Sequence, residues 1–432
     1  MPEIAPFKGI RYDPAVIGDL ANVVAPPYDI ISPEEQEALY ALHPNNCIRL
    51  ILGKEEPTDD KADNRYTRSA AALREWRAAG ALREDETPAV YPYEQQFTWE
   101  GTTYARRGFL AALRLTPFGE GQVFPHEFTL PGPKVDRLAL MKATGANTSP
   151  IFGLFPDDEH DVAGVLEGVW SGEPLVDIAD EKGLRHRMWM VTDADMLSRL
   201  ADLMAPRPLY IADGHHRYET ACAYADWASA EGETTGDLHQ YCIMMCVAMS
   251  DPGLVVLPTH RLLTGLGDLA AEDFVAALSD AFEVEALDEP QRTPAQMTRL
   301  LRQRAGQHAF GLVAEAGERA WVLTVRDEAH LDERPGEASA DWRRLDVAIL
   351  ADLIIDDTLK GRLGRDVELA YDHNAASTWH AVATGACQMA LIVNATPAER
   401  VQAIAAGGER MPPKSTFFYP KLLSGLVFRR LK

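Results

Sequence analysis

One segment constrains the fold of this chain more than any other, because a buried strand leads directly into an amphipathic helix through a group of polar residues. Residues 209–212 are apolar or aromatic and predict a buried strand. Apolar residues then recur at helical spacing from Tyr218 to Ala225, so one face of the following helix packs against a core. Residues 213–217, Asp-Gly-His-His-Arg, lie between the two. The segment therefore predicts a strand–turn–helix unit whose turn carries charged side chains.

This turn has the chemistry of a phosphate site. The first turn of a helix has N–H groups without partners and a partial positive charge, so it attracts anions. Gly214 permits a tight turn and the close approach of a ligand. Arg217 offers a planar fork for phosphate oxygens, and His215 and His216 add donors or acid–base groups near neutral pH. Asp213 is a candidate metal ligand or catalytic group, and the alternatives are a plain helix cap with surface histidines or a two-histidine metal site.

A second group of candidates lies in a loop rich in glycine and proline. Glu127 follows His126 there, and a carboxylate beside a histidine is a candidate general base. Lys134 and Arg137 lie one turn apart on an expected helix over 134–144, an arrangement that lets both face one anion. A solvated loop with ordinary charge spacing is the alternative.

The end of the chain departs from the acidic character of the rest. Residues 411–432 contain no Asp or Glu, and three aromatic residues at 417–419 lie between two lysines. Lys414 and Ser415 are therefore candidate substrate-binding residues at the wall of a pocket. An edge strand with solvated lysines is the alternative.

The net charge limits the class of partner. The 432 residues include 42 Lys and Arg against 65 Asp and Glu, a formal charge of −23. Binding to nucleic acid regardless of sequence needs a basic surface, so we expect no DNA partner, and any anion must be held by a local basic pocket. No apolar run predicts a membrane span, and the first residues do not resemble a signal peptide. Five cysteines without paired spacing favour the reducing cytoplasm.

Helical and strand patterns alternate irregularly, which predicts the α+β class. Polar stretches divide the chain into an N-terminal α+β region at 1–88, a core at 89–265 and a C-terminal α+β region at 266–432. The first region contains an expected strand at 48–52 and a helix that starts after Ser32 with a capping box. In the core, the arms of a hairpin are expected at 90–93 and 97–99, and the apolar run 241–249 predicts a central strand.

Four separated motifs together resemble a bacterial and archaeal family known as a large domain of unknown function. The motifs are residues 27–32 (Pro-Tyr-Asp-Ile-Ile-Ser), 126–127 with 129–133, 213–217, and 414–416 with 419–423. This resemblance covers nearly the whole chain but names no reaction.

Two of these motifs, 125–127 and 213–217, also resemble the free-serine kinases of the ParB/sulfiredoxin-like superfamily. The resemblance implies a phosphate-binding core in which Gly214 to Arg217 hold nucleotide phosphates and Glu127 is the catalytic base on a serine hydroxyl. It also implies ADP or ATP as the donor, with Mg²⁺. The expected function is therefore a nucleotide-dependent phosphotransferase on a small hydroxyl substrate. The alternatives are a phosphoserine phosphatase and a non-enzymatic nucleotide-binding switch.

Overall fold

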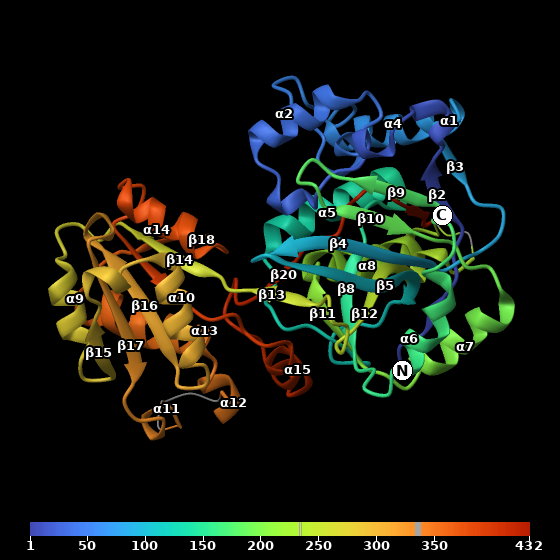
Figure 1. Cartoon of the computed structure of the whole chain (residues 1–432). Coiled ribbons are helices and arrows are strands. Elements are labelled where there is room, and N and C mark those ends of the chain that lie inside the picture. Colours follow the sequence, from blue (N-terminus) through green and yellow to red (C-terminus); the bar gives the residue numbers. More distant parts are fainter. Residues whose placement is uncertain (233, 235, 333–337) are drawn as a thin grey trace. The chain divides into compact units, whose positions relative to one another are not determined.

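Contacts along the backbone divide the chain into two units that do not follow the order of the sequence (Figure 1). The computed structural model describes residues 1–232, 234, 236–332 and 338–432. The first unit combines residues 1–125, 129–255 and 420–432, and the second combines 126–128 with 256–419. Both contain helices and sheets, so the α+β class is confirmed. The expected division at residues 88 and 265 stays a prediction.

A nine-stranded sheet forms the centre of the first unit. Its order is β6-β11-β8-β12-β5-β4-β10-β9, with β1 paired to β5. β8 and β12 run parallel, whereas β11 pairs antiparallel with β8, and β5 antiparallel with β12. β12 is central, as its apolar run predicts. The strands are β1 (Ile4–Ala5), β4 (Tyr91–Trp99), β5 (Thr102–Arg114), β6 (Val123–Phe124), β8 (Ile151–Phe155), β9 (Val176–Ala179), β10 (Arg185–Met188), β11 (Leu209–Asp213) and β12 (Tyr241–Ala248).

Helices pack on this sheet, and a smaller sheet of order β3-β2-β21-β7 has its own core with the N-terminal helices. Its strands are β2 (Gly9–Tyr12), β3 (Leu82–Glu84), β7 (Ala146–Asn147) and β21 (Phe428–Arg430). The helices of the unit are α1 (Pro14–Ile17), η1 (Leu20–Asn22), η2 (Tyr28–Ile30), α2 (Pro33–Leu42), α3 (Ile48–Ile51), α4 (Arg65–Ala78), α5 (Pro131–Thr144), α6 (Asp161–Leu166), η3 (Glu167–Val169), α7 (Ala194–Met204), α8 (His215–Glu231) and η4 (Leu238–Gln240).

Two local expectations are wrong. Residues 48–51 form helix α3 rather than a strand, because the side chain of Asn46 accepts the N–H of Ile48 at 2.9 Å and starts a helical turn. Residues 90–93 and 97–99 are not the two arms of a hairpin, since 91–99 is the single strand β4 and the turn to β5 lies at Glu100 and Gly101, both with positive φ. The capping box at Ser32 is confirmed.

The second unit is built on a six-stranded antiparallel sheet of order β15-β17-β16-β19-β14-β18. Alternate residues of β16 belong to two different hydrophobic clusters, so both faces of the sheet are covered by helices. The strands are β13 (Val255–Leu257), β14 (His260–Thr264), β15 (Phe282–Ala286), β16 (Ala309–Ala314), β17 (Arg319–Val325), β18 (Glu368–Asp372), β19 (Met389–Ile392) and β20 (Phe417–Tyr419), of which β13 and β20 pair separately.

The helices of the second unit include a π-helix, η7 (Leu350–Arg362), which continues directly from α13 (Asp346–Ile349). The others are α9 (Ala271–Leu278), η5 (Glu289–Gln291), α10 (Pro294–Gln303), η6 (Glu315–Gly317), α11 (Ala329–Asp332), α12 (Ala340–Arg343), α14 (Ala375–Ala383) and α15 (Ala398–Ala406).

Candidate functional site

The expected strand–turn–helix unit is confirmed at residues 209–231. β11 ends at Asp213, Gly214 has a φ of 93°, and α8 begins at His215. A Cβ atom at position 214 would lie 2.9 Å from Nε of Arg217, whose side chain folds back over the glycine. Glycine is therefore required here both by its positive φ and by the close approach of the guanidinium.

Asp213 is held between two cations. Its Oδ1 accepts from Nζ of Lys421 at 2.6 Å, and its Oδ2 accepts from Nη2 of Arg217. Burial alone would raise the pKa of Asp213, but the charges of Lys421 and Arg217 outweigh burial and hold the pKa well below its usual value. Nη1 of Arg217 donates to the carbonyl oxygen of Pro150. We call these three side chains the Asp213 cluster, which carries two positive charges and one negative charge.

A further buried cation lies close to this cluster. Arg106 on β5 is fully buried, packs its guanidinium 4.6 Å from the ring centre of Phe152, and donates to the carbonyl oxygen of Pro420 at 2.5 Å. Burial lowers the pKa of Arg106 to about 10, so it stays charged at neutral pH. The electrostatic influence of Asp213 extends to Arg106. The end of β11 is therefore a local centre of positive charge in a strongly acidic chain.

A small cavity of about 40 Å³ adjoins Arg217. Arg137 also lines it, with its guanidinium 3.9 Å from the ring centre of Tyr28. Three consecutive polar residues also line the cavity: Asn147, Thr148 and Ser149. Within the described residues, the buried Oδ1 of Asn147 has no hydrogen-bond partner. The cavity therefore brings together the guanidinium groups of two predicted phosphate-binding residues.

The other candidates of this unit lie on or beside α8. Nε2 of His216 accepts the backbone N–H of Leu130 at 2.8 Å, so the ring proton of a neutral His216 sits on Nδ1. His215 is buried. Nζ of Lys134 donates to Oε2 of Glu219 at 2.9 Å. Lys134 of α5 is thus paired with a residue of α8, whereas Arg137 lines the small cavity. That the two side chains face one anion stays a prediction.

The remaining candidates belong to the second unit. His126 is fully buried, and its Nε2 lies 2.9 Å from the hydroxyl of Thr416. The backbone of Glu127 pairs with that of Met411 in an isolated parallel β-bridge. The hydroxyl of Ser415 is turned to the carbonyl oxygen of Pro412 at 2.5 Å. Lys414 is exposed, with a φ of 58°.

The structure therefore assembles the predicted residues in two groups, one per unit. Asp213, Gly214, His216 and Arg217 lie together at the start of α8, and His126 lies beside the loop that carries Ser415. The roles of Glu127, His126, Lys414 and Ser415 toward the first group stay predictions.

Sequence reasoning missed two contributors to the site. Lys421 completes the Asp213 cluster from a distance of 208 positions along the chain. Lys421 lies in the C-terminal run without acidic residues, but within this run only Lys414 and Ser415 were predicted as site residues. Asn147 carried no recognisable signal, because an isolated asparagine after a helix is ordinary in sequence.

The surroundings of Asp213 do not fit a magnesium ion. Magnesium takes oxygen ligands in near-octahedral geometry, whereas both carboxylate oxygens of Asp213 already face cations. Over the described ranges, no group of three or more His, Cys, Asp and Glu side chains is arranged to hold a metal ion. The metal-binding role of Asp213 stays a prediction, and we derive no step through a metal.

In the part of the chain that the structure describes, no helix is both long and apolar enough to cross a membrane. All five cysteines are free, and Cys47, Cys242 and Cys246 are buried in cores. The expected cytoplasmic location stays a prediction.

Several solved structures resemble the chain weakly. A mutant free serine kinase in complex with AMP shares 15% identity over 69% of this chain and 84% of its own, with a TM-score of 0.34. A conserved hypothetical protein from Pyrococcus furiosus shares 16% over 70% and 89%, with a TM-score of 0.33. SbnI with a C-terminal truncation, from Staphylococcus aureus, shares 12% over 74% and 86%, with a TM-score of 0.34. Likeness at this level carries no argument about function.

The comparison of families is more informative than the comparison of structures. No curated protein matches the chain. A family model described as "Protein of unknown function (DUF1015)" matches residues 4–348, which is most of the sequence. The match agrees with the family of unknown function that the four motifs suggested. The chain therefore belongs to the DUF1015 family.

Proposed function

We propose that the protein is a nucleotide-dependent phosphotransferase acting on the hydroxyl of a small substrate, with free serine as the first candidate. One observation carries this proposal: Arg217 and Lys421 bring two cations to one carboxylate at the N-terminus of α8. The Asp213 cluster thus has one surplus positive charge in a chain of formal charge −23, which favours an anion at this point over the rest of the surface. In this proposal the first unit contains a ParB/sulfiredoxin-like core.

The phosphates of ADP or ATP bind at the start of α8. The N–H groups of the first helical turn donate to the anion, and the guanidinium of Arg217, which lies over Gly214, provides charge-assisted hydrogen bonds. Arg137 adds a second guanidinium across the small cavity. Asp213 acts as a positioning residue, because it fixes the orientation of Arg217 and Lys421.

Transfer requires a base on the substrate hydroxyl. Glu127 takes the hydroxyl proton, the oxygen forms a bond to the terminal phosphorus, and the bond from that phosphorus to the leaving nucleotide oxygen breaks. Nδ1–H of His216 and the guanidinium of Arg217 stabilise the charge on the transferred group. Glu127 precedes Leu130, the donor to His216, by three residues in the sequence.

The substrate is held by the second group of candidates. His126, Lys414 and Ser415 offer a ring nitrogen, an ammonium and a hydroxyl, the types of group that recognise a small polar molecule. Lys414 suits a substrate carboxylate, which free serine carries. A phosphoserine phosphatase would use the same groups with water as the nucleophile, so the reaction must be assayed in both directions.

The test compares two variants that separate binding from chemistry. Loss of a charge-assisted hydrogen bond costs roughly 1.5–3 kcal/mol, so Arg217→Ala is expected to weaken ADP or ATP binding about ten- to a hundredfold. Glu127→Gln keeps the side-chain volume and is expected to leave nucleotide affinity unchanged while transfer to serine falls about 10²–10⁴-fold. Isothermal titration measures the first effect and formation of phosphoserine the second.

A matched control is Arg68→Ala. Arg68 lies on α4 and pairs with Asp59 and Asp63, which precede this helix. This substitution should leave both binding and transfer unchanged. Equal loss of binding in the Arg217 and Glu127 variants would contradict the base role of Glu127. Nucleotide binding without transfer or phosphoserine hydrolysis in the wild-type protein would favour the nucleotide-binding switch.

A further inference from the structure

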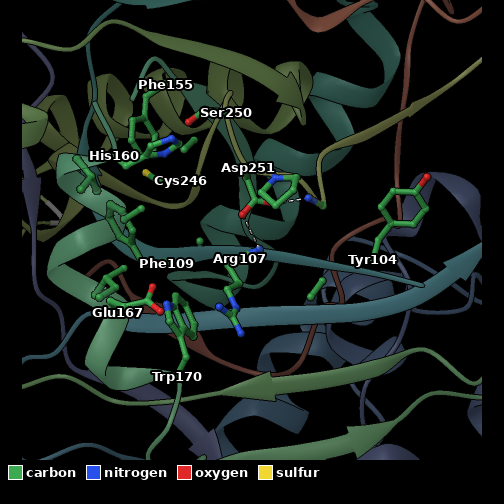
Figure 2. Close-up of a pocket in the computed structure, with 18 of the residues that line it drawn as sticks. Tyr104, Arg107, Phe109, Phe155, His160, Glu167, Trp170, Cys246, Ser250 and Asp251 are labelled. Carbon is green, nitrogen blue, oxygen red and sulfur yellow. Dashed lines mark hydrogen bonds between the residues drawn. The ribbon is translucent and has the colours of Figure 1, made fainter. Parts of the chain in front are cut away.

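A second, much larger cavity lies in the first unit (Figure 2). Its volume is about 600 Å³, within the range of pockets that hold small organic ligands. β5, α6 with η3, and the end of β12 form its walls. Asp213 pairs with Phe152 near the start of β8, whereas Phe155 at the other end of β8 lines this cavity. The two sites therefore lie at opposite ends of the same strand.

One wall of the cavity is apolar. Phe109, Phe155, Val162 and Leu166 are almost completely buried around it, and the ring of Trp170 adds a further aromatic surface. Figure 2 shows Phe109, Phe155 and Trp170 to the left of Asp251. This wall fits an apolar ligand body, because removing such a body from water gains roughly 25 cal/mol per Å² of area.

A carboxylate, Asp251, faces this wall from a rigid turn. Asp251 opens the turn Asp-Pro-Gly-Leu, closed by the bond from the N–H of Leu254 to the carbonyl oxygen of Asp251 at 3.0 Å. Gly253 packs directly on the backbone of β5, where an added Cβ would lie 2.4 Å from the carbonyl carbon of Ala105. Its N–H donates to Oδ1 of Asp251 at 2.9 Å, and the N–H of Arg107 lies 3.4 Å from Oδ2. The carboxylate is thus fixed in place by backbone groups.

The charges of two arginines act on Asp251, and the hydrogen bonds of both side chains go to other groups. Arg106 donates to the side chain of Gln95 and to the carbonyl oxygen of Pro420. Nε of Arg107 donates to Oε2 of the buried Glu94 at 2.8 Å, and its guanidinium lies 5.2 Å from the ring centre of Trp170. A second carboxylate, Glu167, lies exposed at the rim. Each carboxylate oxygen can accept about two hydrogen bonds, so Asp251 retains capacity toward the cavity.

From this geometry we propose that the cavity binds an organic amine, with its ammonium on Asp251 and its apolar body against Phe109, Phe155 and Val162. An alkylammonium is charged at neutral pH and donates up to three hydrogen bonds. The bond to Asp251 is charge-assisted, and Glu167 at the rim favours entry of a cation. This site is independent of the nucleotide site proposed above.

The probe is 2-phenylethylamine, with 2-phenylethanol as its neutral analogue and 3-phenylpropionate as an anionic one. In isothermal titration on the full chain, we expect the amine to bind more tightly than the alcohol. The anion should not bind. Asp251→Asn should weaken amine binding about ten- to a hundredfold and leave alcohol binding unchanged. Asp202→Asn, an exposed carboxylate on α7, is the matched control and should change neither.

A second variant tests the cavity itself without touching the core. Ala163 lines the cavity but is exposed on α6, so Ala163→Phe fills space with little risk to folding. Binding of both the amine and the alcohol should then be lost. Equal amine affinity in the wild type and Asp251→Asn, tighter binding of the anion, or no binding of any probe would overturn the proposal. Nucleotide binding provides an independent readout, which Asp251→Asn should leave unchanged.

Discussion

Asp213 and Asp251 belong to the same unit, but their environments move their pKa values in opposite directions. Burial disfavours the charged form of both. At Asp213 the charges of Lys421 and Arg217 outweigh burial and lower the pKa. At Asp251 burial prevails over the hydrogen bonds from the backbone N–H groups of Gly253 and Arg107 and over the weaker influence of the charges of Arg106 and Arg107, and it raises the pKa to about 6.

This difference shows how a carboxylate's partners decide what it can do. A carboxylate already neutralised by two cations holds them in place and presents their surplus charge to an anion. A carboxylate supported by backbone dipoles keeps its own charge available to a cation. The first arrangement suits a phosphate site and the second an amine site.

The largest effect of a substitution on stability is expected when one cation of the Asp213 cluster is removed. Lys421→Met leaves Asp213 with Arg217 as its partner in the cluster, and removing one member of a buried pair costs roughly 3–5 kcal/mol. Because Lys421 and Asp213 retain 14% and 18% side-chain exposure, we expect a loss of about 3 kcal/mol in the free energy of unfolding, measured in urea. Adding Asp213→Asn should recover part of this loss, and a change below about 0.5 kcal/mol in Lys421→Met would contradict the charge balance described here.

The second prediction concerns the pH dependence of the stability that Asp251 contributes. The pKa of Asp251 is raised in the folded state from 3.8 to about 6, so its contribution to stability is fully present below about pH 4 and is lost as pH rises through 6. We expect this component to amount to about 3 kcal/mol, measured by urea unfolding at several pH values. Asp251→Asn should lack it, whereas Asp202→Asn should retain it. A slope that survives in Asp251→Asn must come from another group.

A third test addresses the backbone that supports the Asp213 cluster. Gly214 and Gly232 stand at the two ends of α8, both with positive φ. Ala at position 232 meets no atom within 4 Å and is expected to cost about 1 kcal/mol, from backbone strain. Ala at position 214 also displaces the guanidinium of Arg217, so we expect about 2 kcal/mol together with weaker nucleotide binding. Equal effects of the two variants would show that Arg217 does not depend on Gly214.

The smallest effect is expected at a pair that water reaches. Lys134 and Glu219 retain 37% and 31% side-chain exposure, and such pairs contribute about 0–1 kcal/mol. Lys134→Ala should therefore change the free energy of unfolding by less than about 1 kcal/mol in urea. A loss as large as that of Lys421→Met would show that burial does not determine how much each of the two ion pairs contributes to stability.

Local patterns predicted much of the secondary structure. The capping box at Ser32 and the strand–turn–helix unit at 209–231 both depend on residues close in sequence. The strand expected at 48–52 was wrong because the side chain of Asn46 accepts the N–H of Ile48, which favours a helical turn there. The hairpin was misplaced because its turn lies at Glu100 and Gly101, whereas Glu94, between the two expected arms, is a buried strand residue paired with arginines.

The site was only partly predictable for a related reason. Arg217 lies four positions after Asp213, about one helical turn away, so the pairing of these two side chains follows from their spacing. Lys421 reaches the same carboxylate only through the tertiary fold, and the large cavity around Asp251 depends on three elements that meet in space. Neither has a signature in a single sequence.

The return of residues 420–432 to the first unit has a consequence for synthesis on the ribosome. Residues 256–419 of the second unit leave the exit tunnel before Lys421 and strand β21 are available. The later unit can thus complete its sheet while the earlier one still lacks a strand beside β2 and the cation on Asp213. Until residues 420–432 emerge, the first unit of a nascent chain therefore has an unfinished sheet edge, and unpaired strand edges make partly folded chains prone to aggregation.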